Sequence, residues 1–420
     1  MRPSAFVAAL ALLALPAHAG VIVVDKHMAP GADVPQISQA IGIASPGDTI
    51  LVRPAGVGTY DPFDVSIGVT IVADKEFEVA LGATVRVHDL PDGQTVTLRG
   101  ILFYPGSALG SHLLVLEDCA GTVVVDRCRL DPLTAAAAEP ALRVENCSGA
   151  VFSHCEVFGA AGLFIFDDDK QFATSPGSDA MVVRGESLVA LLDCSVRGGF
   201  GGWDSEATPA TGQRGGDALT ISGGTVFASG TQIAGGDGGW DLFTSSPTAK
   251  GGNGGDGVVV NGPATIQLHD STATAGAGGA AGPNGTPGLP GLATSVCCGG
   301  VVETVAGEAR DTFASEGSVS EGATISLALE GAPGEAALVL ISLSADALPA
   351  SAFDGVLVAL PIQREILLPS IGPTGQITLQ GTVPDLGPLE SLNLVVQTLF
   401  GPTNPTLSSV AAVTLLDAQF

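Results

Sequence analysis

Short runs of alternating apolar and polar residues recur along most of this chain, and glycine, asparagine, aspartate or proline separates one run from the next. Alternation with a period of two places one set of side chains on a single face of a strand. The clearest run places its apolar set at Leu188, Ala190, Leu192, Cys194 and Val196. A chain of many such runs is expected to be an all-β protein.

One segment near the N-terminus departs from this period. Its apolar residues recur with the spacing of one helix face, at Ile37, Ala40, Ile41 and Ala44. The dipeptide Pro46-Gly47 ends this pattern, and residues 48–54 read as a strand that stops at a proline. We therefore expect a short helix followed by a strand.

A short phrase recurs between Leu116 and Ser271. Its two clearest copies contain Cys119 with Cys128 and Cys147 with Cys155, so the first cysteines are 28 residues apart and the second 27. Weaker copies continue this column after Cys155 in steps of 39, 37 and 40 residues, at Cys194, Thr231 and Ser271. A repeat of this length predicts a solenoid or a propeller.

The helix and strand at the N-terminus resemble those of a known family. The order I-x-x-A-I-x-x-A-x-P-G-D-T-I-x-V-x-P over residues 37–54, followed by G-x-Y over 58–60, resembles the N-terminal helical cap and first coil of the pectate-lyase-like superfamily. This resemblance covers residues 34–276 and implies a right-handed parallel β-helix. Neither the Arg-x-Pro-x-x-Arg phrase of its lyases nor the grouped aspartates of its hydrolases is found here.

Extra residues enter successive coils at one repeat position, after the equivalents of Cys155. These glycine-rich insertions span 159–178, 198–216 and 235–255, and a Gly/Pro tail follows at 276–291. Insertions at one repeat position emerge from one side of a solenoid, which is often its binding side. We expect the glycine pairs before Asp217 and Asp256, at the ends of two insertions, to serve tight turns with positive φ.

The composition changes near residue 313, where closely spaced strand patterns replace the glycine-rich phrases. We predict a β-helix over 20–292, a linker or irregular cap over 293–312, and a small antiparallel β-sandwich over 313–420. Such a terminal domain is expected to close the open end of the solenoid.

Residues 1–19 have the features of an export signal, with Arg2, an apolar run and the small-residue site Ala17-His18-Ala19. No later apolar run is long enough to span a bilayer. The predicted location is therefore extracellular or at the cell surface, with no transmembrane segment after cleavage.

The formal net charge of −27 argues against nucleic acids and anionic membranes as partners. This charge serves solubility, or it attracts divalent cations.

The seven cysteines fall into two repeat positions and one vicinal pair in a Gly-rich segment: Cys119, Cys128, Cys147, Cys155, Cys194, Cys297 and Cys298. Residues at one repeat position stack across neighbouring coils, so they form either a ladder of buried thiols or disulfides between coils. Their pairing is left open. The outward positions Arg127, His154 and Asp193 form one possible ladder of catalytic groups up the helix, and cross-coil surface pairing explains it equally well.

Both tryptophans lie in the insertions, in the phrases Trp203-Asp204 and Trp240-Asp241. Equivalent positions on adjacent coils bring two indoles together, which suits stacking on sugar rings. The alternative is that each ring folds back as the apolar anchor of a polyglycine loop.

Two insertions end in Gly-Gly-Asp, at Asp217 and Asp256. Residues 251–259 match one copy of the calcium-binding nonapeptide G-G-x-G-x-D-x-U-x, although no second copy follows at nine residues. These aspartates are therefore candidate calcium ligands, with turn formation as the alternative. Arg214 beside Asp217 is the best available pair for a lyase.

The expected function is binding or surface structure, directed towards polysaccharide through the glycine-rich face. The first alternative is a calcium-assisted polysaccharide lyase acting on uronates. The second is an envelope protein with a purely structural role.

Overall fold

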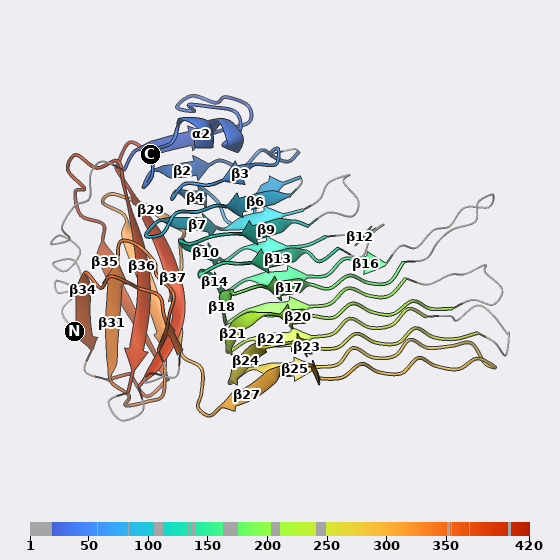
Figure 1. Cartoon of the computed structure of the whole chain (residues 1–420). Coiled ribbons are helices and arrows are strands. Elements are labelled where there is room, and N and C mark those ends of the chain that lie inside the picture. Colours follow the sequence, from blue (N-terminus) through green and yellow to red (C-terminus); the bar gives the residue numbers. More distant parts are fainter. Residues whose placement is uncertain are drawn as a thin grey trace.

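The computed structural model describes residues 19–56, 58–82, 84–104, 112–132, 134–135, 139–162, 175–202, 211–240, 249–350, 353, 355–368, 370–401 and 405–420. The export signal predicted at 1–19 lies outside this part of the chain except for Ala19. The chain is a right-handed parallel β-helix followed by a β-sandwich, as predicted (Figure 1). No helix among the described residues is long and apolar enough to cross a membrane.

Three long parallel sheets form the walls of the β-helix. The first, called here the seam sheet, contains β1 (Val21–Val24), β2 (Thr49–Val52), β4 (Thr70–Ala73), β7 (Thr95–Arg99), β10 (Thr122–Asp126), β14 (Gly149–Ser153), β18 (Leu188–Leu192), β21 (Gly224–Ser229), β24 (Ala264–His269) and β27 (Val301–Val305). The second contains β5 (Val79–Leu81), β8 (Ile101–Phe103), β11 (Arg129–Leu130), β15 (Glu156–Phe158), β19 (Ser195–Arg197), β22 (Gln232–Ala234) and β25 (Thr272–Thr274). The third contains β3 (Asp64–Val65), β6 (Val85–His88), β9 (Leu114–Glu117), β13 (Leu142–Glu145), β17 (Met181–Arg184), β20 (Leu219–Ser222), β23 (Val258–Asn261) and β26 (Thr294–Cys297).

Inward apolar side chains from these walls fill the solenoid with one continuous core. The helix α2 (Ile37–Ile43) buries Ile37 and Ala40 against this core and covers its N-terminal end (Figure 1). A short pair of strands, β12 (Thr134–Ala135) and β16 (Ala161–Gly162), extends from the walls. The cap that the 37–54 phrase predicts is therefore this single short helix.

The repeat predicted from the cysteines is confirmed by the strand register. Asp126 pairs with Ser153 and Ser153 with Leu192, so Cys128, Cys155 and Cys194 follow in step on successive coils. All seven cysteines are free, and five are buried. The Cys194 amide donates to Thr231 Oγ1 at 3.3 Å. Of the two interpretations, the structure shows the ladder of buried thiols, which Thr231 continues.

Residues 293–312 are not a linker. They contain β26, which pairs with β23, and β27, which pairs with β24, so they build a further coil of the solenoid. The boundary predicted at 292 is therefore too early, because these strands carry little apolar patterning on the exposed last coil.

The C-terminal domain is a sandwich of two mainly antiparallel sheets around a separate core. One sheet contains β28 (Asp311–Ala314), β30 (Thr324–Glu330) and β35 (Gln376–Thr382). The other contains β29 (Ser318–Ser320), β37 (Thr406–Leu416), β36 (Ser391–Phe400), β31 (Ala337–Ser342) and β34 (Arg364–Leu368), and the pairing of β29 with β37 is parallel. A hairpin of β32 (Leu348–Ala350) and β33 (Gly355–Leu357) lies beside them.

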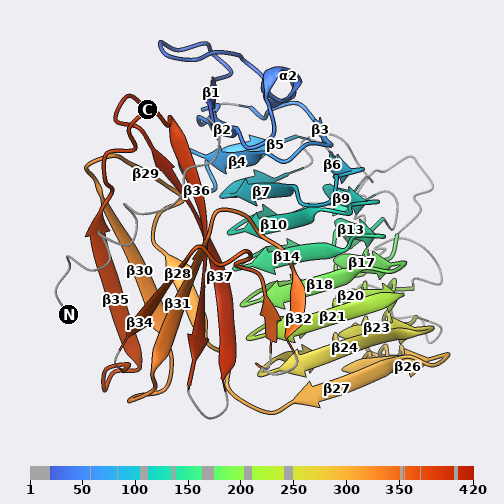
Figure 2. The same ribbon diagram turned by 60° about the vertical axis from the view of Figure 1, so that its left-hand side comes forward.

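The sandwich packs along the side of the β-helix and does not close its end, which corrects the prediction of a terminal cap (Figures 1 and 2). Outward side chains of the seam sheet, among them Val124, Val151 and Phe227, form one apolar cluster with Val395 and Val410 of the sandwich. Strands that are buried on both faces read as continuous apolar runs. The run Val123–Val125 in β10 is such a signal.

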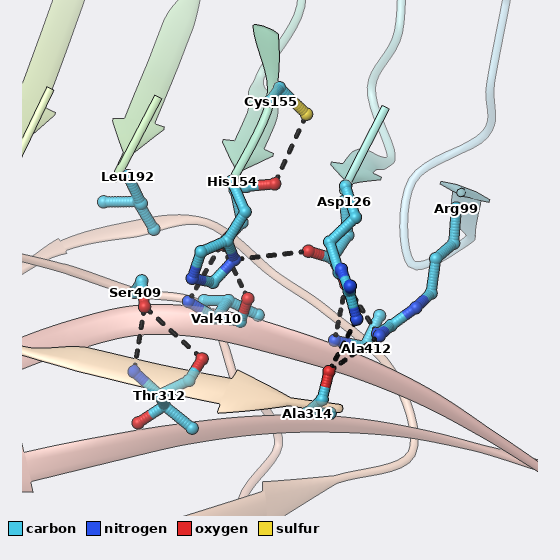
Figure 3. Close-up of polar contacts among 12 residues, drawn as sticks. Arg99, Asp126, His154, Cys155, Leu192, Thr312, Ala314, Ser409, Val410 and Ala412 are labelled. Atoms are coloured by element: carbon cyan, nitrogen blue, oxygen red, sulfur yellow. Dashed lines mark hydrogen bonds and ion pairs between the residues drawn. The ribbon is translucent and has the colours of Figure 1, made fainter. Parts of the chain in front are cut away.

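A charged cluster lies at the same seam. Arg99, from β7, places Nη1 2.6 Å from Asp126 Oδ2, and both side chains are 1% exposed. Arg127 donates to the carbonyl of Ala314 in the sandwich at 2.8 Å, and His154 Nε2 lies 2.8 Å from Asp311 Oδ1. Arg127 and His154, two of the three predicted ladder positions, therefore serve a domain interface rather than an exposed face. Figure 3 shows His154 at this seam, close to Val410 of the sandwich.

Candidate functional site

The glycine-rich insertions extend from one side of the β-helix as an array of parallel and antiparallel segments (Figure 1). We call this array the glycine arms. Its outgoing segments are 159–162, 198–202, 235–240 and 275–280, and its returning segments are 175–179, 211–217, 249–257 and 286–293. The tips of the three insertions lie outside the described residues.

Exposure along the arms has a period of three. In 198–202 and 235–240, two glycines are buried and the third residue is more exposed, namely Phe200, Asp237 or Trp240. Three residues per turn without hydrogen bonds inside the segment is the geometry of a polyproline II helix. The arms are therefore built from polyproline II segments that pack side by side.

Backbone hydrogen bonds join these segments in two directions. The Gly238 amide donates to the carbonyl of Ala277 in the next outgoing segment at 2.8 Å. The Gly236 amide donates to the carbonyl of Gly216 in a returning segment at 2.9 Å. Since two of every three residues bond within the array, the third side chain points away from it.

Glycine is required here because the backbones touch. A Cβ added at Gly236 would lie 2.0 Å from the carbonyl oxygen of Gly199. None of the described glycines in 198–202, 211–217, 235–239 or 249–257 has a positive φ. The prediction that glycine pairs serve turns with positive φ is therefore wrong for the arms, and close approach is the reason instead.

The last returning segment ends the array. Lys250 aligns with Thr286, so Pro287 and Pro290 stand where Gly251 and Gly254 stand one coil earlier. The amides of Gly251 and Gly254 donate to this last segment at 2.9 Å. Proline has no amide hydrogen, and it suits polyproline II. At these two positions of the returning segment, no amide donor therefore points past the last coil.

In the outgoing segments, the residue that follows each pair of buried glycines points away from the array. These residues form one outer surface, called here the outgoing face. Trp240 is 56% exposed and Phe200 is 44% exposed, so both large aromatic rings are accessible to solvent. The Arg197 guanidinium lies 4.9 Å from the Phe200 ring centre and 3.6 Å from Asp237 Oδ2. The structure thus excludes the anchor interpretation for Trp240, while Trp203, Asp204 and Asp241 lie outside the described residues.

Third-position residues of the returning segments form the opposite face. Asp217 Oδ1 accepts the Asp256 amide at 2.6 Å, and Asp256 Oδ1 accepts the Leu292 amide at 2.7 Å. Arg214 Nη2 lies 2.5 Å from Asp217 Oδ1 and 3.9 Å from Asp256 Oδ2. These aspartates therefore bridge successive coils, and their assignment as calcium ligands stays a prediction.

The pairing of Arg214 does not favour proton abstraction. Burial lowers its pKa, but the hydrogen bond and attraction from Asp217 outweigh burial and raise the pKa of the guanidinium above its ordinary value. A general base must release its proton near the working pH. Arg214 is thus suited to holding a charge rather than to the lyase role.

The sequence predicted that the insertions emerge from one side of the solenoid, but it did not predict their conformation or their two faces. The signal was present as the repeated order G-G-x in residues 198–203 and 235–240. A period of three in glycine is typical of close-packed polyproline II chains.

Comparisons with known proteins yield a likeness at the level of fold. No family model matches the chain, and no curated protein matches it. One similar solved structure is the enzymatically active domain of bacteriophage CBA120 tailspike protein 2, with 10% identity, 96% of this chain, 73% of that chain and a TM-score of 0.22. Another is full-length tailspike protein 2 from an Escherichia coli O157:H7 bacteriophage, with 12% identity, 97% of this chain, 60% of that chain and a TM-score of 0.25.

Proposed function

We propose that this is an exported surface protein that binds polysaccharide on the outgoing face of the glycine arms. The observation that carries the proposal is the exposure of Trp240 and Phe200 on a backbone-bonded, regular support. Exposed aromatic side chains on a soluble protein mark interaction sites. Their flat apolar faces suit the apolar faces of sugar rings.

The spacing of the two rings fits an extended ligand. Phe200 aligns with Asp237, and Trp240 follows Asp237 by one polyproline II turn, which is about 9 Å. Adjacent coils add about 4.8 Å in the perpendicular direction. A sugar chain lying obliquely across two coils would therefore contact both rings, with Arg197 and Asp237 available for hydrogen bonds to its hydroxyls.

Charge favours a neutral polysaccharide over a uronate polymer. The chain has a formal charge of −27, and Arg197 is already paired with Asp237. A polyanion would be repelled by this field and would gain no free cation at the rings. The proposed ligand is therefore an uncharged polysaccharide.

Retention of the protein in gels that contain a neutral polysaccharide or a uronate polymer tests this function. The variants Trp240→Ala and Phe200→Ala should each lose most of the retention by the neutral polymer, because each removes one stacking surface. A matched control is Leu289→Ala, which removes an exposed side chain of the last coil. Unchanged retention by both aromatic variants, or release of unsaturated uronates by the wild-type protein, would reject the proposal.

A further inference from the structure

A mixed group of one histidine and two carboxylates lies at the seam between the β-helix and the sandwich. Ligand atoms of His154, Asp193 and Asp311 all lie within 4.8 Å of one another. His154 and Asp193 hold equivalent positions of adjacent coils, since Ser153 pairs with Leu192. Asp311 is the first residue of β28 in the sandwich. The group therefore joins two coils and the second domain.

The backbone presents the two solenoid residues in the same way. His154 has φ 52° and Asp193 has φ 51°. This left-handed conformation is uncommon for residues other than glycine, although histidine and aspartate tolerate it better than most. Repetition of the same turn on adjacent coils directs both side chains towards the sandwich.

Neighbouring groups orient the imidazole so that Nε2 faces the carboxylates. Ser153 Oγ donates to the carbonyl of Val410 at 2.6 Å and lies 3.1 Å from His154 Nδ1, so it accepts the Nδ1 hydrogen. Asp126 Oδ1 lies 3.5 Å from the same nitrogen. Asp126 is fully buried. Figure 3 shows the ring of His154 lying between Asp126 and the strand that contains Val410.

This arrangement matches the surroundings of metal-bound histidines. Such a ring usually gives its second nitrogen hydrogen to a carboxylate or similar acceptor, which fixes the tautomer and frees the other nitrogen for the metal. Asp126 and Ser153 would act in that way, and Ser409 Oγ donates to Asp311. Of the nearby arginines, Arg127 pairs with Glu76, and Arg310 pairs with Glu335 and with Glu308.

A polar pocket of about 440 Å³ adjoins the group, and its charged lining residues are Asp193, Asp270, Glu308, Arg310, Asp311 and Glu330. It gives an ion a path from solvent and room for a water ligand. The surrounding carboxylates raise the local concentration of cations.

We propose that His154 Nε2, Asp193 and Asp311 bind one zinc ion, which fastens the sandwich to the β-helix. Imidazole with two carboxylates suits zinc, and three protein ligands leave the fourth position to water. Ligand atoms around four-coordinate zinc lie about 3.3 Å apart, so small side-chain rotations would close the group.

Thermal unfolding of the full chain with and without Zn²⁺ tests the site, in a Cys297→Ser/Cys298→Ser background that removes the exposed thiols. Saturating Zn²⁺ should raise Tm by about 4 °C or more, because the ion binds only the folded state. Titration calorimetry should give one ion per chain. X-ray absorption should report nitrogen and oxygen ligands near 2.0–2.1 Å and no sulfur.

The variant Asp193→Asn separates a metal site from a purely structural cluster. Without Zn²⁺ it should equal or exceed the parent in Tm, because it removes a carboxylate that is repelled by Asp311. With Zn²⁺ the shift in Tm should disappear. The control Asp270→Asn changes a carboxylate of the same pocket outside the ligand group and should keep the shift. A shift that survives in Asp193→Asn, or no shift in the parent, would overturn the proposal.

Discussion

Arg99 and Asp126 form an ion pair that the sandwich covers completely, with 2.6 Å between Nη1 and Oδ2 and 1% exposure of each side chain. Breaking a buried pair by removing one partner leaves a charge without compensation, at a cost of about 3–5 kcal/mol. We therefore expect Arg99→Leu to lower the free energy of unfolding by that amount. Urea denaturation measures it.

A matched control exists on the solvent side of the same solenoid. Arg86 pairs with Glu117 at 3.2 Å, but the Arg86 side chain is 46% exposed. Exposed ion pairs contribute about 0–1 kcal/mol. Arg86→Leu should therefore change stability little, and equal losses in both variants would show that burial of the Arg99 pair is not what matters.

The seam also predicts how stability depends on pH when a chelator removes metal ions. Burial lowers the pKa of His154, but hydrogen bonds and attraction from Asp126 and Asp311 outweigh burial and raise it to about 10. A histidine with a raised pKa contributes its full stability below the ordinary value of 6.5 and loses it as pH rises towards 10. The free energy of unfolding should thus fall by up to about 1.4 kcal/mol per pH unit in that window.

Asp193 lies beside His154 and Asp311, and its titration predicts a second pH range in which the free energy of unfolding changes. Burial, and then repulsion by Asp311, raise its pKa to about 7, so folding favours its protonated form. Stability should fall between pH 3.8 and 7 for this reason. Asp193→Asn should flatten that lower window and leave the upper one. A flat profile from pH 4 to 10 in the parent protein would contradict both assignments.

The cysteine ladder predicts which thiols react. Burial raises the pKa of Cys128 to about 12 and that of Cys155 well above its ordinary value. The thiolate is the reactive form, so buried thiols are inert. A thiol reagent should modify two groups quickly in the native protein, Cys297 and Cys298, and seven after denaturation. Fast modification of more than two would mean that the ladder is accessible.

Local sequence patterns predicted the coil structure well because each coil repeats the same physical requirements. Cys155, Cys194 and Thr231 were aligned from spacing alone, and the register confirms that alignment. The position of the sandwich was mispredicted because it depends on the outward face of the seam sheet. The continuous apolar run Val123–Val125 indicated a covered face but not which domain covers it.

For the glycine arms, the sequence predicted the position but not the conformation. Their place in the repeat was predictable, yet glycine was assigned to turns because positive φ is its commonest use. The period of three becomes apparent only when residues 198–203 and 235–240 are compared and interpreted as two chains that pack against each other. The sequence aligned His154 and Asp193 on adjacent coils, but it did not predict the proposed zinc site. Asp311 is 118 residues beyond Asp193 in sequence and joins it only through domain packing.

Close packing in the arms predicts a local response to a single methyl group. The Gly236→Ala variant would place Cβ against the Gly199 carbonyl, so the segments must separate there. Amide exchange of Gly236 and Gly255, which bond across the array, should become at least about tenfold faster. Amides of β21 should stay protected. The control Gly42→Ala lies in α2 with nothing within 4 Å and should be neutral or stabilising.

The two prolines that end the array predict a change in association. Replacing Pro287 and Pro290 with glycine restores two amide donors. The amides of Gly251 and Gly254, one coil earlier, donate to the last segment, so the two restored amides would point past it, where no further coil accepts them. Unpaired edges of this kind recruit further chains, and proline is one of the devices that blocks them. The double variant should keep its fold and self-associate at concentrations where the parent does not, which sedimentation velocity would detect. The matched variant Leu289→Gly changes the intervening third position, whose amide already donates to Asn253 Oδ1 at 3.0 Å, and should not associate. If both variants sediment like the parent, the prolines do not protect this edge.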